Sequence, residues 1–246
     1  MWLMFGKDPT PPERPSPEIE AMLAAEHAFA VQTRGFIDEV PKRSGPVVAE
    51  AVVAFERAMA GPGLIGAAFH QNFSMALRVC GKNELADEWQ ISALEVFSQH
   101  PPLKWRASLL AHAVADSCFQ TERFIQAEAW AGRSITEGLL GTVDCPWMAD
   151  TWRIYAQALS VDNMGPEVER RLREAVRLWK TVKGPDPRRS MYAFVGLAMH
   201  LRQLGRFPES EAAFEDAIEF SSKFPPQARA FHDTAVEQLK RYRQQN

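Results

Sequence analysis

Residues 194–218 read FVGLAMHLRQLGRFPESEAAFEDAI, and this stretch decides the fold. Its first half places large apolar residues at three- and four-residue spacing, as one face of an amphipathic helix requires. The turn Leu204-Gly205 follows, and the second half then repeats the helical spacing. Small residues such as Ala198 and Ala217 allow two helices to approach closely. The stretch therefore predicts an antiparallel helix hairpin.

The same two-helix pattern occurs four times along the chain at a nearly constant period. The first-helix patterns start at His70, Ala111, Trp152 and Phe194. The second pattern opens at the same offset from the first in every unit, at Ala86, Ala127, Val168 and Ser210. Self-similarity at a fixed period is the signature of repeat architectures. The sequence therefore predicts an all-α stack, with four repeats in residues 62–224.

Over about residues 67–224 the chain resembles the tetratricopeptide-repeat (TPR) proteins, and the last unit carries this resemblance most clearly. The resemblance implies a right-handed α-solenoid of antiparallel helix hairpins. Its period of about 41–42 residues is longer than the family's usual period of about 34. Units one and two depart from the family pattern, with His70 and Ala111 where an aromatic residue is usual.

Three further segments flank the repeats. Residues 1–16 contain a proline-rich stretch and are expected to form an extended arm with an apolar start. Residues 17–61 are expected to form an N-terminal helical hairpin. Residues 225–246 show a single apolar stripe at helical spacing. This last segment is expected to cap the solenoid, because the final repeat of a stack otherwise exposes an apolar face.

Composition limits the classes of function. The chain is 46% hydrophobic and 24% charged, as in a folded soluble protein, and its net charge of −3 gives no nucleic-acid footprint. Its three cysteines are widely spaced, which fits a reducing compartment. We find no apolar run long enough to span a bilayer. The expectation is a cytoplasmic protein that neither binds nucleic acid nor spans a membrane.

The sequence offers little support for catalysis. None of the six histidines lies in a zinc-protease motif or at metal-ligand spacing from a cysteine. The glycine-containing stretch 61–66 lacks the Lys-Ser/Thr of a phosphate loop. His112 and Asp116 are one helical turn apart on one predicted helix, so an enzyme would need this pair in a deep pocket. We therefore expect no enzyme activity, no catalytic residues, no metal and no cofactor.

In TPR proteins the first helix of each unit lines a concave groove, so the resemblance implies that these helices bind a peptide or a partner protein. Amide side chains suit an extended backbone, and arginines suit carboxylates. The groove residues implied are Gln71, Asn72, Met75, Arg78, His112, Asp116, Phe119, Arg153, Gln157, Tyr192, Met199 and Arg202.

The resulting hypothesis is a protein–protein interaction module that serves as an adaptor, scaffold or accessory subunit. The alternative is a regulatory protein gated by a ligand or short peptide, which a pocket enclosed on both sides would favour over an open groove.

Two other surfaces are candidate partner sites. Trp2, Leu3 and Phe5 form a docking arm that needs a hydrophobic surface. The solenoid itself or a second copy of the chain in a homo-oligomer is preferred for that surface over another protein or a membrane. The basic stretch 170–189 contains interleaved acidic residues, so it is expected to be a solvated outer face and not a phosphate-binding patch.

Overall fold

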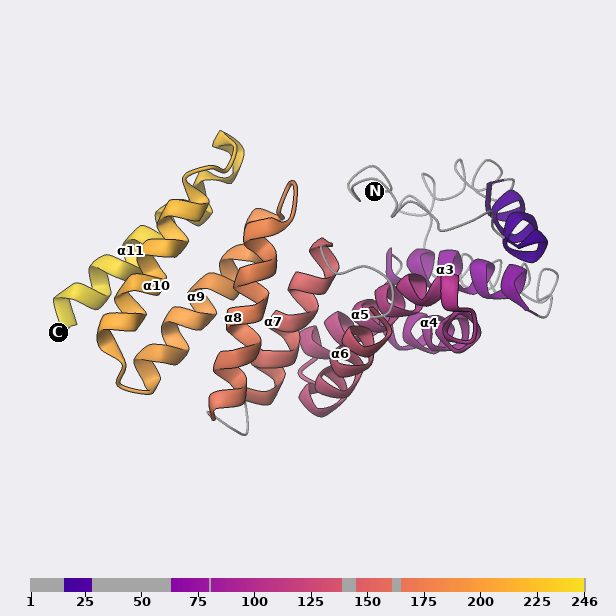
Figure 1. The fold of residues 1–246 in the computed structure, drawn as a ribbon, viewed down its shortest axis with the longest axis horizontal. Helices are drawn as coiled ribbons and strands as arrows, with labels where there is room; N and C mark the ends of the chain where they lie inside the picture. Colours follow the sequence, from indigo (N-terminus) through magenta and orange to yellow (C-terminus); the bar gives the residue numbers. More distant parts are fainter. Residues whose placement is uncertain (1–15, 28–62, 80, 139–144, 161–164, 246) are drawn as a thin grey trace.

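The computed structural model describes residues 16–27, 63–79, 81–138, 145–160 and 165–245 (Figure 1). Every regular element in these ranges is a helix. Residues 17–27 form a helical segment, and 3-10 turns precede α5 and α11. The longer helices are α3 (Leu64–Val79), α4 (Asn83–Ser98), α5 (Lys104–Gln120), α6 (Phe124–Gly138), α7 (Pro146–Ser160), α8 (Pro166–Thr181), α9 (Pro187–Gln203), α10 (Phe207–Ser221) and α11 (Arg229–Gln245).

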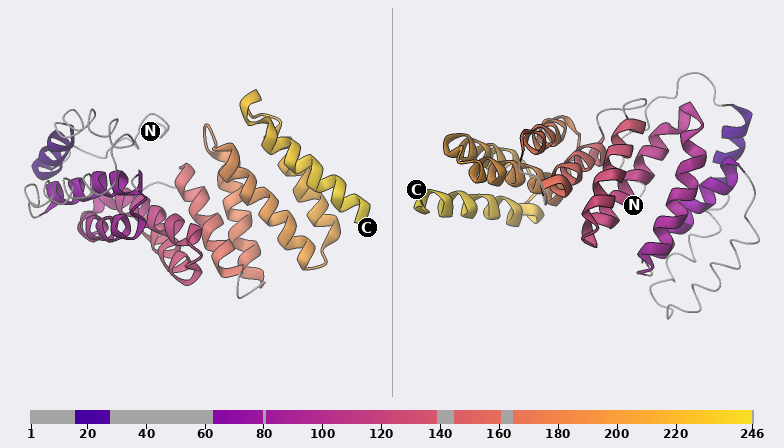
Figure 2. Two further views of the ribbon diagram at one scale, coloured as in Figure 1. Left: turned by 180° about the vertical axis from the view of Figure 1, so that it is seen from behind. Right: turned by 90° about the horizontal axis from the view of Figure 1, so that it is seen from below.

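The helices pack in chain order. We call α3, α5, α7 and α9 the A helices and α4, α6, α8 and α10 the B helices. Each A helix packs on the B helix that follows it, and each B helix packs on the next A helix or, at the end, on α11. Figures 1 and 2 show the resulting elongated array from α3 to α11. The prediction of an all-α solenoid is confirmed.

The helix boundaries follow the period seen in the sequence. The number of residues from the start of one A helix to the start of the next is close to the sequence period. The same spacing separates successive B helices, and it also separates α9 from α11. Because α11 keeps this spacing and packs on both α9 and α10, it occupies the A position of a fifth unit. Its Ala235 and Leu239 are buried there, and Phe231 packs against the core.

The A helices lie closer to one another than the B helices do. α5 contacts α7, α7 contacts α9, and α9 contacts α11, whereas the well-packed pairs of the described chain include none between successive B helices. A stack that is tighter on one side must curve toward that side. The A helices therefore form the inner face of the solenoid, and the B helices form its outer face.

Three of the A-to-B turns use the same backbone device. Gly81, Glu122 and Gly205 occupy equivalent places and have positive φ angles of 74°, 60° and 73°. A left-handed residue ends a helix by turning the chain away from its axis, and glycine adopts this conformation without steric cost. The second unit makes the same turn with a glutamate.

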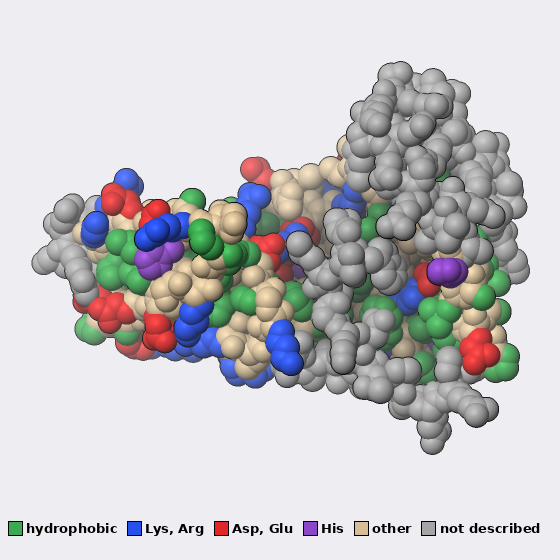
Figure 3. All heavy atoms as spheres, turned by 90° about the horizontal axis from the view of Figure 1, so that it is seen from above, with side chains coloured by type: hydrophobic (Ala, Val, Ile, Leu, Met, Phe, Trp, Pro, Cys, Tyr) green, Lys and Arg blue, Asp and Glu red, His purple; other side chains and the backbone are tan. Residues whose placement is uncertain are grey.

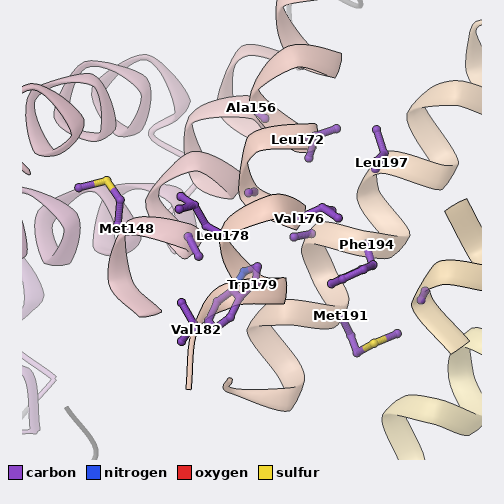
Figure 4. Close-up of a cluster of buried hydrophobic side chains, with 14 of the residues drawn as sticks. Met148, Ala156, Leu172, Val176, Leu178, Trp179, Val182, Met191, Phe194 and Leu197 are labelled. Atoms are coloured by element: carbon purple, nitrogen blue, oxygen red, sulfur yellow. The ribbon is translucent and has the colours of Figure 1, made fainter. Parts of the chain in front are cut away.

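The largest core cluster lies between α7, α8 and α9 (Figure 4). Trp179 of α8 and Phe194 of α9 are each 1% exposed. Phe194 also stacks on Phe220 of α10, with ring centroids 4.6 Å apart. Alanines at several facing positions leave room for these large side chains, so each interface alternates large and small residues.

The α5–α6 hairpin is fastened by a reciprocal pair of serines. Ser108 Oγ donates to the Ser134 carbonyl at 2.8 Å, and Ser134 Oγ donates to the Ser108 carbonyl at 2.8 Å. A Cβ at Gly138 would collide with the Met148 methyl and would lie 2.8 Å from Ser108 Oγ. A larger residue at this position would therefore require the Met148 and Ser108 side chains to shift.

Helix 17–27 packs against the N-terminal part of the stack. Met22 is fully buried and Ile19 is 7% exposed, both in a cluster with residues of α3, α4 and α5. Glu26 accepts two hydrogen bonds from Arg106 of α5, at 2.6 and 2.8 Å. The second helix expected for the N-terminal hairpin lies outside the described residues.

None of the described helices combines the length and the apolarity that a bilayer span requires.

Candidate functional site

A charged cluster joins three successive A helices on the inner face. At its centre is Asp150 of α7, whose side chain is 1% exposed. Its carboxylate accepts from Arg153 Nε at 2.6 Å and also from Arg189 of α9. Arg189 Nη2 donates to Asp116 of α5 at 3.1 Å. We call Asp116, Asp150, Arg153, Arg189 and His112 the inner-face cluster; its two carboxylates and two guanidinium groups balance in charge.

Charge pairing decides the ionisation of Asp150. Burial alone would raise the pKa of this carboxyl, but the positive charges of Arg153 and Arg189 outweigh burial and hold the pKa below its ordinary value. Asp150 is therefore ionised in the folded protein. Because the aspartate binds one arginine from its own helix and one from α9, it fixes α9 against α7.

The hydrogen bonds around His112 define its tautomer. Thr151 Oγ1 donates to the Trp147 carbonyl at 2.7 Å, so toward His112 Nδ1, 3.0 Å away, it can only accept. The proton of the ring therefore lies on Nδ1, and the bare Nε2 faces Arg189 Nη1 at 3.5 Å. Burial lowers the pKa of His112, which agrees with a neutral ring. His112 thus orients Arg189 and Thr151.

Arg153 supports the aromatic side chains of this face. Its guanidinium carbon lies 5.5 Å from the ring centroid of Phe119 and 5.8 Å from that of Tyr192. Arg188 donates to the Tyr192 hydroxyl at 3.0 Å and lies over the same ring. Tyr192 is nevertheless 47% exposed. It therefore presents a large aromatic surface in one held position.

A pocket of about 150 Å³ opens beside the inner-face cluster, between α7, α8 and α9. Arg153 Nη1 donates to Gln157 Oε1 at 2.6 Å, which connects the cluster to the pocket wall. We call it the His200 pocket. It is lined by Gln157, Ser160, Val168, Leu172, Gly196, Met199, His200 and Gln203.

The structure brings half of the predicted groove residues together. His112, Asp116, Phe119, Arg153, Gln157 and Tyr192 all belong to the connected set on α5, α7 and α9, and Met199 lines the adjoining pocket. Their depth differs, however. His112 and Arg153 are 7% and 5% exposed, so they lie beneath the face and not on it. Tyr192, at 47% exposure, is the most exposed of the six.

The predicted residues of α3 are placed apart from this set. Arg78 donates to Asp87 and Gln90 of α4, each at 2.6 Å, and to a carbonyl of α5. It therefore ties three helices together. Gln71 is 7% exposed, whereas Asn72 and Met75 are half-buried. Arg202 is half-buried near the end of α9. The arm residues Trp2, Leu3 and Phe5 lie outside the described residues.

Sequence reasoning misses the two residues that organise the cluster, Asp150 and Arg189. Asp150 is absent from the predicted groove although it shares a helix face with Arg153, one turn further along. Arg189 falls within the basic stretch expected on the outer face, whereas it lies in the first turn of α9 and points to α5 and α7. Opposite charges on the same face of successive first helices are the signal that would have identified both.

The basic stretch is neutralised by ion pairs with neighbouring acids. Arg170, Arg173 and Arg177 pair with glutamates on their own helix, and Lys180 reaches Asp216 of α10 at 2.8 Å. These exposed pairs agree with the expected solvated outer face, whereas Arg171 of the same stretch is only 7% exposed. Seen from above, acidic, basic and hydrophobic side chains are interspersed over the C-terminal half of the molecule (Figure 3).

Acidic residues at one repeat position also form ion pairs with arginines of the next repeat. Asp87, Glu128 and Glu169 occupy equivalent positions of three successive units, and each pairs with an arginine of the next repeat. The distances are 2.9 Å for Arg123 to Asp87 and 3.2 Å for Arg171 to Glu128, and Arg206 contacts Glu169. These pairs fasten neighbouring units along the outer part of the stack.

Comparison with known proteins gives a fold and no family. No protein-family model matches the sequence, and no curated protein matches it. Among solved structures, the chain is similar to the crystal structure of BtubC (BKLC) from P. vanneervenii, with a TM-score of 0.60. That match covers 86% of this chain and 91% of the other at 12% sequence identity. The likeness extends along most of both chains, and at this identity it shows a shared fold.

Proposed function

We propose that the chain is a TPR-like interaction module that binds a peptide or a segment of a partner protein along its inner face. In this role it acts as an adaptor, scaffold or accessory subunit, without catalysis. The repeat period, the A–B hairpins and the small residues at the helix contacts support the TPR-like assignment. Cys118 is a free and buried thiol, which supports a cytoplasmic setting.

The observation that carries the proposal is the held position of Tyr192. An aromatic side chain that is 47% exposed and fixed by Arg153 and Arg188 loses little conformational entropy on binding. Tyrosines of this kind supply much of the binding energy at protein interfaces. Phe119 and Met199 are half-buried on the same A helices and extend the apolar surface.

The charge balance of the inner-face cluster indicates what kind of segment would bind. Both guanidinium groups are already paired with carboxylates, so the face offers aromatic surface and hydrogen bonds without a net charge. Arg153 in particular is expected to hold Tyr192 and Gln157 and not to bind a partner carboxylate. The proposed ligand is therefore a segment without strong net charge.

The second candidate is a regulatory protein gated by a ligand that binds in the His200 pocket, although this pocket is partly open and not enclosed on both sides. It is formed by three helices of two successive repeats, so an occupant would bind α7, α8 and α9 together. Binding of this kind would stabilise one curvature of the solenoid.

A random dodecapeptide phage library panned on the immobilised full chain tests the proposal. Peptides selected by the native protein should lose binding to Tyr192→Ser, because the inner face loses its exposed aromatic side chain. They should retain binding to Phe207→Ser, a matched change, since Phe207 is 44% exposed at the start of α10. Calorimetry on the selected peptides would then give the affinities.

Two results would contradict the proposal. One is the absence of any peptide enriched above an uncoated surface. The other is a set of peptides that the two serine variants bind equally well, which would place binding away from the inner face.

A further inference from the structure

The chemistry of the His200 pocket begins with Gln157. Arginine is only a donor, so the atom of Gln157 that faces Arg153 must be the amide oxygen. The amide nitrogen Nε2 is then turned toward Gly196, where a Cβ built on the glycine would lie 3.3 Å away. Gly196 and Gln157 both line the pocket. The inner-face cluster thus fixes a hydrogen-bond donor at the pocket wall.

His200 forms another part of the wall and is only 3% exposed. Within the described part of the chain, neither of its ring nitrogens has a hydrogen-bond partner. Burial lowers the pKa of His200, so near pH 7 the ring is neutral and carries one donor and one acceptor. Both nitrogens are covered as the ring lies in this structure. Buried polar groups of native proteins are rarely left unpaired.

The size of the pocket indicates a side chain. A single water needs about 10–15 Å³ of such space, so a pocket of about 150 Å³ holds more than one. Pockets for drug-sized ligands are larger, about 300–1,000 Å³. The apolar part of the wall, from Val168, Leu172 and Met199, suits the hydrocarbon part of a side chain.

The lining also indicates the charge of the occupant. None of the eight lining residues is an ionised side chain. Ser160 and Gln203 end α7 and α9, so the pocket lies at the negative ends of two helix dipoles, which disfavours an anion. The donor Gln157 Nε2 in turn disfavours an ammonium group, which can only donate. A neutral group with both an acceptor and a donor fits this wall.

We propose that the His200 pocket binds an uncharged carboxamide, supplied by an Asn or Gln side chain of the segment that lies along the inner face. Its carbonyl oxygen accepts from Gln157 Nε2, and its N–H group donates to the acceptors at the ends of α7 and α9. This inference rests on the proposed function, because it assumes that a polypeptide segment occupies that face.

The direct test uses three small probes of similar size on the full chain, namely acetamide, acetate and methylammonium. Binding is followed by NMR at the Met199 methyl group and the His200 ring nitrogens. Acetamide should shift both sets of signals saturably, and the two ions should bind at least about tenfold more weakly, the factor expected for one good hydrogen bond. Equal responses to all three probes, or none to acetamide, would overturn the assignment.

The substitution Gln157→Glu gives a sharper prediction. A glutamate can still accept from Arg153, but its second oxygen turns an acceptor toward the pocket in place of a donor. The preference should therefore shift from acetamide toward methylammonium, while circular dichroism stays unchanged. Gln126→Glu, an exposed position of α6, is the matched control and should leave the preference as it is. An unchanged preference in the Gln157 variant would overturn the proposal.

The two tests fail separately. If peptides are selected through Tyr192 but acetamide does not bind, the pocket assignment is wrong and the interaction module stands. If acetamide binds but no peptide is selected, the pocket takes a free small amide, and the peptide source proposed here is wrong. If both succeed, the selected peptides should carry Asn or Gln at a fixed distance from the position that contacts Tyr192.

Discussion

Asp150 shows how much of the inner face depends on one buried carboxylate. It binds Arg153 on its own helix and Arg189 on the next A helix, and through them it affects Tyr192 and Gln157. A buried charge is tolerated only when it is paired, and removal of one partner leaves the others without compensation. The positions of Tyr192 on the inner face and of Gln157 in the pocket wall therefore both depend on Asp150.

The substitution Asp150→Asn keeps the shape of the side chain but removes its charge. Arg153 then loses its carboxylate partner and Arg189 keeps only Asp116, so the free energy of unfolding should fall by about 3 kcal/mol in urea denaturation. Asp216→Asn is the control, because its pair with Lys180 is about half exposed on the outer face. That change should cost less than about 1 kcal/mol. Equal losses in the two variants would show that Asp150 has no special role.

His112 predicts a pH dependence of stability. Burial is the main cause that lowers the pKa of His112 in the folded protein. Below pH 6.5 the imidazole is therefore protonated in the unfolded chain but still neutral in the folded protein. Stability is then lost as the pH falls, by up to about 1.4 kcal/mol per pH unit for this group. Urea midpoints at pH 7.5 and 5.5 should differ less in His112→Asn than in the native protein. Above pH 7.5 His112 should not make the free energy of unfolding depend on pH. A pH dependence in that range would come from another group.

At the scale of elements, the hairpin turns show which positions the repeat constrains. Gly81, Glu122 and Gly205 share a left-handed backbone although only two of them are glycine. A glutamate with positive φ is strained by its Cβ. The turn of the second unit therefore forms because the packing of α5 on α6 requires it, against the local preference of the residue.

Replacement of this glutamate should relieve the strain. Glu122→Gly is expected to stabilise the protein by up to about 1 kcal/mol, since the removed strain exceeds the extra entropy of the unfolded glycine. Gly205→Ala, at the equivalent turn, should destabilise it by about 1 kcal/mol. Thermal melting of both variants shows whether each substitution stabilises or destabilises the protein. A loss of stability in Glu122→Gly would indicate that the glutamate side chain makes a contact worth more than the strain.

At the scale of the whole molecule, the stability of each helix should depend on the helices packed directly against it. Each described helix packs on those next to it in the chain, so a change in one unit reaches distant units only through the units between. With this organisation, one part of the inner face is expected to bind a peptide segment without a change in the structure at the ends of the stack.

A matched pair of core substitutions tests this. Leu239→Ala in α11 and Leu110→Ala in α5 remove the same atoms from buried sites at 6% and 2% exposure. Each should cost about 2–4 kcal/mol. Hydrogen exchange should accelerate in α9–α11 for the first variant and in α3–α6 for the second. Uniform acceleration along the chain in both would mean that the solenoid unfolds as a single unit.

The all-α class and the sequential packing of helix hairpins could be read from the sequence. They rest on local information: the spacing of large and small residues, the turn glycines and a nearly constant repeat period. These patterns act within one hairpin or between adjacent ones. For the same reason half of the predicted groove residues lie together on α5, α7 and α9, because a helix face follows from periodicity alone.

Only the tertiary structure decided what those residues do. The sequence cannot show that Arg189 crosses to Asp116, because the two are far apart in the chain and meet through the approach of α9 to α5 and α7. Nor can it show which side chains become buried: His112 and Arg153 share the periodicity of Tyr192, yet they lie beneath the face while Tyr192 lies on it. How deeply a side chain is buried, and which residue it pairs with, depend on how closely successive A helices pack. All the side chains at the interface together set that distance.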